Sequence, residues 1–171
     1  MCLVLDANAF SLCFDASNAA HSDFRPVLDW LVHGKGKLVY GGNKYKKELK
    51  DAGKYLRFFV ALNRAGKTVC LDDTSVDEIE KEVRDIEPSE KFDDPHLIAI
   101  ILKSKCNIIC TKDMRAKPYL KDSRFYLGIT SRPKLYTSKK NASLLTDKYI
   151  ADICRPCERL NKKDASAIFS P

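Results

Sequence analysis

The sequence lacks any apolar run long enough to cross a membrane, and it lacks internal repeats and low-complexity segments. A membrane-spanning helix needs about 20 predominantly apolar residues. The first apolar stretch, Leu3 to Leu5, is too short and too quickly followed by an acid to act as a signal peptide. We therefore expect a cytoplasmic protein with no membrane partner.

Histidine is scarce, with three residues, and the seven cysteines are scattered along the chain. Several of the cysteines fall inside apolar runs, which is typical of reduced core thiols in a cytosolic protein. Cys154 and Cys157 form one C-x-x-C pair, but no second pair or histidine follows at the spacing of a zinc finger. We therefore expect free thiols and no zinc site.

What the sequence does contain is enough apolar and charged surface for one ordinary globular domain. The chain has 171 residues, of which 44% are hydrophobic and 31% are charged. Thirty Lys and Arg residues against 23 Asp and Glu residues give a formal charge of +7. A positive field of this kind favours a polyanionic partner.

Short apolar segments typical of buried strands alternate with amphipathic segments typical of helices. Strands are expected within "LVLDAN", "KLVYGGN", "KTVCLDD", "NIICTKD" and "PKLYTSKK". Helices are expected over 24–33, over 44–64 with a break at Gly53, after a capping box of Ser75 and Glu78, from "DDPHLIAIILKSK" and from "ASLLTDKYIADIC".

Strands that are apolar throughout and separated by helices imply a parallel sheet with helices on both faces. We therefore expect a single α/β domain over residues 1–171. Its architecture should be a three-layer α/β/α sandwich with a central parallel sheet of about five strands.

Two acids, Asp6 and Asp113, directly follow expected strands. In open α/β sheets the ligand crevice lies beyond the carboxyl ends of the strands, near a topological switch point. Glu48, on the helix after the second strand, and Asp94, at the start of the buried helix, are placed to join them. Four carboxylates around one crevice would repel one another unless a cation stood between them. Oxygen ligands of this kind suit Mg²⁺ or Mn²⁺.

Each acid also has a purely structural interpretation. Asp6 and Asp94 could cap the helices that follow them, and Asp113 could belong to a turn. Glu48 could form an i, i+4 ion pair with Lys44. The order and placement of the four acids together favour a site.

The series "LVLDAN", "YGGNKYKKEL", "DDPHLIAIIL" and "NIICTKD" resembles the PIN-domain family of metal-dependent nucleases. The match covers 1–137, and 138–171 would then be a C-terminal helical extension. The resemblance implies that the catalytic residues and metal ligands are Asp6, Glu48, Asp94 rather than its neighbour Asp93, and Asp113. It also implies supporting hydrogen bonds within the acidic cluster from Asn8 and Thr111.

The implied activity is the hydrolysis of RNA phosphodiester bonds with Mg²⁺ or Mn²⁺, in which no histidine is needed. His96, beside Asp94, is interpreted as structural. Basic residues near the acids would bind RNA phosphates, above all Lys44, Lys47, Lys112 and Arg115, with Lys46, Lys50, Lys117, Lys134, Lys139 and Lys140 around them. Many small family members are bacterial toxins held inactive by a small antitoxin, so the resemblance implies an antitoxin partner and a homodimer as well.

The chain departs from the family pattern after Asp113, where many relatives carry a further acid and this chain has Met114 and Arg115. That departure favours an alternative, a catalytically inactive PIN-like scaffold that binds RNA or protein. A phosphoacceptor signalling domain is a second alternative, with Asp72 and Asp73 after the third strand. That class requires paired acids after the first strand, however, and Asp6 stands alone.

Overall fold

The computed structural model describes residues 2–127, 132–146 and 151–169. Within these residues the strands form one parallel sheet in the order β3-β2-β1-β4-β5. The strands are β1 (Cys2–Leu5), β2 (Lys37–Tyr40), β3 (Thr68–Cys70), β4 (Ile108–Cys110) and β5 (Lys134–Tyr136). All five expected strand segments therefore form strands, and the predicted α/β sandwich with a parallel sheet is confirmed.

The central strand β1 pairs with β2 on one side and with β4 on the other. Leu3 aligns with Leu38 of β2, and Val4 aligns with Ile109 of β4. All four residues of β1 are buried, because helices cover both faces of the sheet. This is why the strand is apolar throughout and does not alternate.

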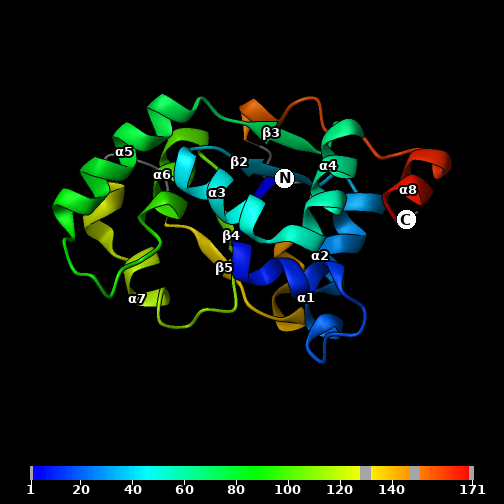
Figure 1. Ribbon diagram of the computed structural model, residues 1–171, viewed down its shortest axis with the longest axis horizontal. Helices are drawn as coiled ribbons and strands as arrows, with labels where there is room; N and C mark the ends of the chain where they lie inside the picture. The colour runs from blue at the N-terminus through cyan, green and yellow to red at the C-terminus, as the bar shows by residue number, and fades with distance from the viewer. Residues whose placement is uncertain (1, 128–131, 147–150, 170–171) are drawn as a thin grey trace.

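The helices form two outer layers (Figure 1). The layer on the left contains α5 (Asp73–Ile86), α6 (Pro95–Ser104) and the short α7 (Lys117–Leu120). The layer on the right contains α1 (Phe10–Phe14), α2 (His21–His33), α4 (Leu56–Arg64) and α8 (Lys162–Phe169). None of the helices in the described part of the chain is both long and apolar enough to span a bilayer.

The expected break at Gly53 is confirmed. The region divides into α3 (Asn43–Asp51), a 3-10 turn η2 (Gly53–Tyr55) and α4. Gly53 has a positive φ of 47°, a conformation that glycine adopts without strain. The break separates α3 from α4, and α3 contacts α5 and α6 near the carboxyl ends of the strands.

One cap differs from the prediction. The side chain at the start of α5 that accepts the helix amide is Asp72, not Ser75: Asp72 Oδ2 accepts hydrogen bonds from Ser75 N at 2.9 Å and Ser75 Oγ at 2.8 Å. Both residue types cap helices, and the chain leaves β3 early enough for the aspartate to take that position. Ser75 is already within the helix.

The prediction of one helix over "ASLLTDKYIADIC" is wrong for its described residues. The stretch begins inside the 3-10 segment η4 (Lys139–Leu144), continues without regular structure and ends in the 3-10 segment η5 (Asp152–Cys154), while 147–150 lie outside the described residues. The amphipathic pattern gives way to tertiary contacts, since Leu144 and Leu145 pack against the core and Cys154 is buried beside β1. The remaining 3-10 segments are η1 (Ala7–Ala9) and η3 (Ser123–Tyr126).

The expectation of free thiols is also corrected, because Cys2 and Cys154 form a disulfide with Cα atoms 6.5 Å apart. The two residues are 152 positions apart in the sequence, so no local pattern could pair them. Lys67, which is 1% exposed, adds a second attachment. Its Nζ donates to the carbonyls of Glu158 and Gly34, each at 3.0 Å. The C-terminal segment is thus fastened to the start of the sheet.

Candidate active site

The candidate site lies at the topological switch point of the sheet. The chain runs from β1 outward to β2 and β3, and then returns to place β4 on the other side of β1. Asp6 directly follows β1 and Thr111 directly follows β4. The Asp6 amide donates to the Cys110 carbonyl at 2.9 Å, which brings these two strand ends together.

The Asp6 carboxylate is 3% exposed and has a full set of donors around it. Thr111 Oγ1 donates to Oδ2 at 2.6 Å, and Asn8 donates to Oδ1 from its amide at 3.1 Å and to Oδ2 from Nδ2 at 2.7 Å. Burial raises the pKa of Asp6, and the hydrogen bonds from Thr111 and Asn8 oppose that rise. The predicted contacts of Asn8 and Thr111 with this acid are confirmed. Asp6 also caps η1, so the structural interpretation holds beside the functional one.

Glu48 projects from α3 toward the N-terminus of α6. Its Oε1 lies 3.2 Å from Lys44 Nζ, and its Oε2 lies 3.2 Å from His96 Nε2. Burial disfavours the charged carboxylate, but His96 and Lys44 outweigh it and lower the pKa of Glu48. The predicted ion pair with Lys44 is therefore present, and it leaves Oε2 directed at His96.

Asp94 occupies the N-cap position of α6, but its side chain makes no capping hydrogen bond. Ligand atoms of Asp94, Glu48 and His96 all lie within 4.8 Å of one another. Burial, followed by the negative charge of Asp6, raises the pKa of Asp94 to about 7. The helix-capping interpretation of this acid thus fails, and the carboxylate points into a site that already holds two others.

His96, interpreted from the sequence as structural, lies inside this cluster. It is 0% exposed, its Nε2 forms the 3.2 Å ion pair with Glu48 Oε2, and its Nδ1 has no hydrogen-bond partner among the described residues. A buried imidazole with one unpartnered nitrogen calls for a specific reason. Its position two residues after Asp94, in the first turn of the same helix, was the available signal.

Glu80 of α5 is a second acid that sequence reasoning did not select. Burial raises its pKa, and the charge of His96 lowers it in part. Glu80 lines a groove between α3 and α5 together with Asn43 and Lys44. No motif identifies this acid, because it reaches the site only through the packing of α5 against α6.

Asp113 adjoins the cluster but is turned away from it. Its amide donates to Thr111 Oγ1 at 2.9 Å, which links it to Asp6 through one hydroxyl. Its carboxylate pairs instead with Arg115, whose Nη2 lies 2.5 Å from Oδ2 and whose hydrogen bonds lower the pKa of Asp113. Of the four predicted acids, the structure brings Asp6, Glu48 and Asp94 together and holds Asp113 at the margin.

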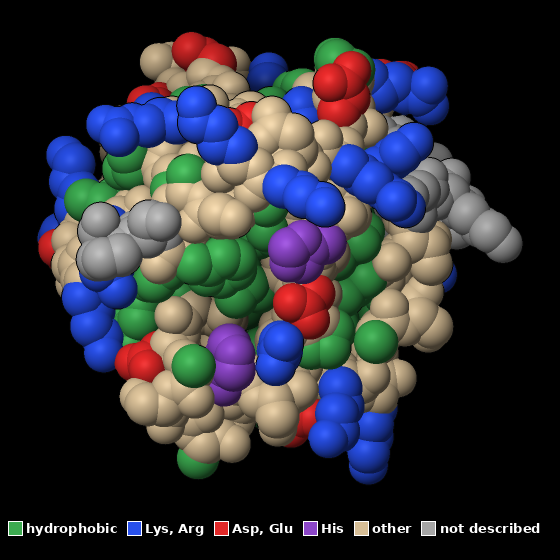
Figure 2. All heavy atoms as spheres, turned by 90° about the vertical axis from the view of Figure 1, so that its right-hand side faces the viewer, with side chains coloured by type: hydrophobic (Ala, Val, Ile, Leu, Met, Phe, Trp, Pro, Cys, Tyr) green, Lys and Arg blue, Asp and Glu red, His purple; other side chains and the backbone are tan. Residues whose placement is uncertain are grey.

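Three of the predicted RNA-binding cations pair with acids. Lys44 and Arg115 make the ion pairs with Glu48 and Asp113, and Lys46 pairs with Asp73 at 2.5 Å. The other predicted cations are exposed, namely Lys47, Lys50, Lys112, Lys117, Lys134, Lys139 and Lys140. Figure 2 shows that Lys and Arg side chains also surround the face covered by α2, α4 and α8. The positive charge is therefore not confined to the surroundings of the acids.

The two acids of the phosphoacceptor alternative both have structural contacts. Asp72 caps α5, while Asp73 accepts the Gly42 amide at 2.9 Å and pairs with Lys46. These contacts account for both carboxylates without a phosphorylation site.

Comparison of the chain with protein families, with curated proteins and with solved structures gives no match. The function must therefore be argued from the geometry of the site itself.

Proposed function

We propose that this chain is a divalent-metal-dependent endoribonuclease of the PIN type, acting with Mg²⁺ or Mn²⁺. One observation carries the proposal. Glu48, Asp94 and the buried His96 bring ligand atoms within 4.8 Å of one another beside the charge of Asp6, and His96 Nδ1 has no hydrogen-bond partner among the described residues.

The residues present fit a bound cation. Asp94, Glu48 and His96 offer ligand atoms within 4.8 Å of one another, and Asp6 adds a third negative charge to the same field. A divalent ion would offset the burial and the repulsion from Asp6 that raise the pKa of Asp94, and it would accept a nitrogen of His96 as a ligand. Carboxylates suit both Mg²⁺ and Mn²⁺, whereas an imidazole ligand favours Mn²⁺.

When bound, the ion would supply a water of lowered pKa and would neutralise charge on the phosphoryl oxygens. Glu48, Asp94 and His96 would hold it. Asp6, held by hydrogen bonds from Asn8 and Thr111, would add its negative charge to the same site. Because these donors are already in place, the Asp6 carboxylate need not reorient during the reaction.

The single-stranded or structured RNA substrate would be held through its phosphates. Lys47 and Lys112 are exposed beside the acids, and Arg115 lies at the mouth of the site on Asp113. Contacts of this kind give affinity without sequence choice. A small antitoxin and a homodimer remain part of the proposal through the family resemblance.

A second candidate function is an RNA- or protein-binding scaffold without catalysis. The pairing of Asp113 with Arg115, and the lack of a further acid at Met114 or Arg115, favour it. In that case RNA would bind without being cut.

Cleavage of single-stranded and hairpin RNA in Mn²⁺, in Mg²⁺ and in excess chelator tests the proposal. We expect cleavage only with metal. Asp94→Asn removes a proposed direct ligand, so it should lower the rate by at least roughly 100-fold, which is the upper end of the loss seen when a group that only supports a ligand is removed. Asp93→Asn is the matched control, since this neighbour is exposed and lies outside the ligand group. RNA binding without metal-dependent cleavage would favour the scaffold.

A further inference from the structure

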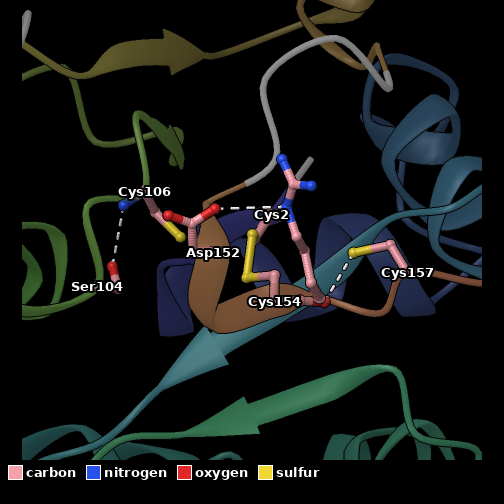
Figure 3. The surroundings of a disulfide bond; sticks show 7 residues. Cys2, Ser104, Cys106, Asp152, Cys154 and Cys157 are labelled. Atoms are coloured by element: carbon pink, nitrogen blue, oxygen red, sulfur yellow. Dashed lines mark hydrogen bonds and ion pairs between the residues drawn. A yellow bond between two sulfur atoms is a disulfide. The ribbon is translucent and has the colours of Figure 1, made fainter.

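A second cluster of metal-ligating side chains lies at the opposite end of β1. Cys2 at the start of that strand, Cys106 in the loop before β4 and Cys154 in η5 are all buried, and their sulfur atoms lie within 4.8 Å of one another. Cys157 lies beside this group, with its Sγ donating to the Cys154 carbonyl at 2.8 Å. Figure 3 shows the four cysteines, which come from three separate segments, with the Cys157 sulfur turned toward that carbonyl.

We propose that these four cysteines, when reduced, bind one zinc ion. In a tetrahedral zinc–thiolate site the Zn–S distance is about 2.3 Å, which places the sulfur atoms roughly 3.8 Å apart. Cys106 Sγ lies within 4.8 Å of the sulfur atoms of Cys2 and Cys154, which are joined by the disulfide and would separate on reduction. Cys157 would turn its sulfur from the Cys154 carbonyl toward the same point. The C-x-x-C spacing of Cys154 and Cys157 is the spacing that lets two thiolates bind one ion.

The three cysteines of the group are buried together, with Cys2 2%, Cys106 4% and Cys154 0% exposed. A divalent cation stabilises thiolates directly, so buried cysteines that meet at one point can hold an ion. The sequence shows no second cysteine pair after Cys157. The fold supplies Cys2 and Cys106 from elsewhere.

The Cys2–Cys154 disulfide is then the oxidised form of the same cluster. An oxidised low-molecular-weight disulfide takes two electrons from the thiolates of Cys2 and Cys154 and leaves as two thiolates. The Cys2–Cys154 bond forms and Zn²⁺ is released, while Cys106 and Cys157 each take up a proton. Both forms fasten the C-terminal segment to β1, but only the zinc form also holds Cys106.

Zinc content of the full chain, purified with a phosphine reductant and measured by elemental mass spectrometry, tests this proposal. We expect one zinc per chain, lost in Cys106→Ser and in Cys157→Ser. Cys70→Ser is the matched control and should retain zinc, because Cys70 is an exposed cysteine outside the cluster. Addition of oxidised glutathione should release the ion and yield one disulfide between the peptides that contain Cys2 and Cys154.

Cobalt substitution separates this site from the acidic one. Co²⁺ bound by thiolates gives an intense sulfur-to-metal charge-transfer band, which carboxylate and imidazole ligands do not produce. We expect the band in the wild type and in Asp94→Asn, so that failure of the nuclease proposal leaves this test intact. A reduced wild type that binds no zinc, or that binds cobalt without the band, would overturn the proposal. If the serine variants do not fold, the wild-type cobalt spectrum alone decides.

Discussion

Strand β1 has a cluster of metal-ligating side chains at each end, and the two clusters differ in almost every physical respect. At its carboxyl end, Asp6 lies near Glu48, Asp94 and His96, where burial and the charge of Asp6 raise the pKa of Asp94. At its amino end, Cys2 meets Cys154 and Cys106, which are buried and covalently linked in part. The acidic cluster lowers the free energy of unfolding, whereas the disulfide-linked cysteines raise it. The comparison teaches that a costly cluster, held in place by a stable fold, is the better candidate for function.

Breaking the sulfur cluster should have the largest effect on stability. Cys2→Ser removes the disulfide that closes most of the chain into a loop, and such losses typically cost 2–4 kcal/mol. Urea unfolding without reductant would measure this loss, and Cys70→Ser should leave the free energy of unfolding nearly unchanged. Equal stability of Cys2→Ser and the wild type would mean that the tail is held by its other contacts alone.

Filling the acidic cluster should stabilise the chain by a comparable amount. Mn²⁺ at a hundred times its dissociation constant would add roughly 2.7 kcal/mol to the free energy of unfolding. Thermal unfolding with and without Mn²⁺ would measure this gain, and Asp6→Asn and His96→Gln should each reduce it. The stabilisation should be larger at pH 8 than at pH 6, because Asp94 must lose its proton to bind the ion. A response that His96→Gln leaves intact would exclude the imidazole as a ligand.

Removing one charge from the metal-free acidic cluster should stabilise the protein. The pKa of Asp94 is raised to about 7 on folding, so the folded state retains a proton that the unfolded state has lost between about pH 4 and pH 7. Wild-type stability therefore falls as pH rises through this window. Asp94→Asn cannot lose stability in this way, so its free energy of unfolding should exceed that of the wild type by about 1–2 kcal/mol at pH 8 in chelator. This value allows for solvent screening of the partly exposed carboxylate. Near pH 4 the difference should vanish, and urea unfolding at both pH values would check this.

The smallest effect concerns the margin of the acidic cluster. Arg115→Ala would free the carboxylate of Asp113, and we expect Mn²⁺ affinity to rise a few-fold if that acid then turns toward the ion. Isothermal titration calorimetry would measure the change. Lys117→Ala, which removes an exposed cation two residues after Arg115, serves as the control for a general loss of positive charge. Unchanged affinity in Arg115→Ala would place Asp113 outside the site altogether.

Local pattern was enough to predict much of the fold. The amphipathic spacing of α2 and the break at Gly53 appear where they were expected, because both depend on residues within a few turns of one another. The same reasoning failed for the stretch before Cys154, where the described residues form short 3-10 segments. Contacts with distant parts of the chain decide the conformation there.

The candidate site was also predictable only in part. Asp6 was identified because a carboxylate at the end of an apolar strand must lie at the carboxyl edge of the sheet. His96 was not selected, because its contact with Glu48 joins residues that are far apart in the sequence. The turn of Asp113 toward Arg115 depends on rotamers that no sequence pattern encodes.

The sequence by itself determined the alternation of strands and helices, and with it the parallel sheet and the edge at which the acids gather. These features follow from hydrophobic periodicity, which is a local property of the chain. Tertiary structure alone decided which side chains meet at either end of β1. The contact of Cys2 with Cys154, like that of Glu48 with His96, joins residues far apart in sequence, and only the packing of the whole fold sets such distances.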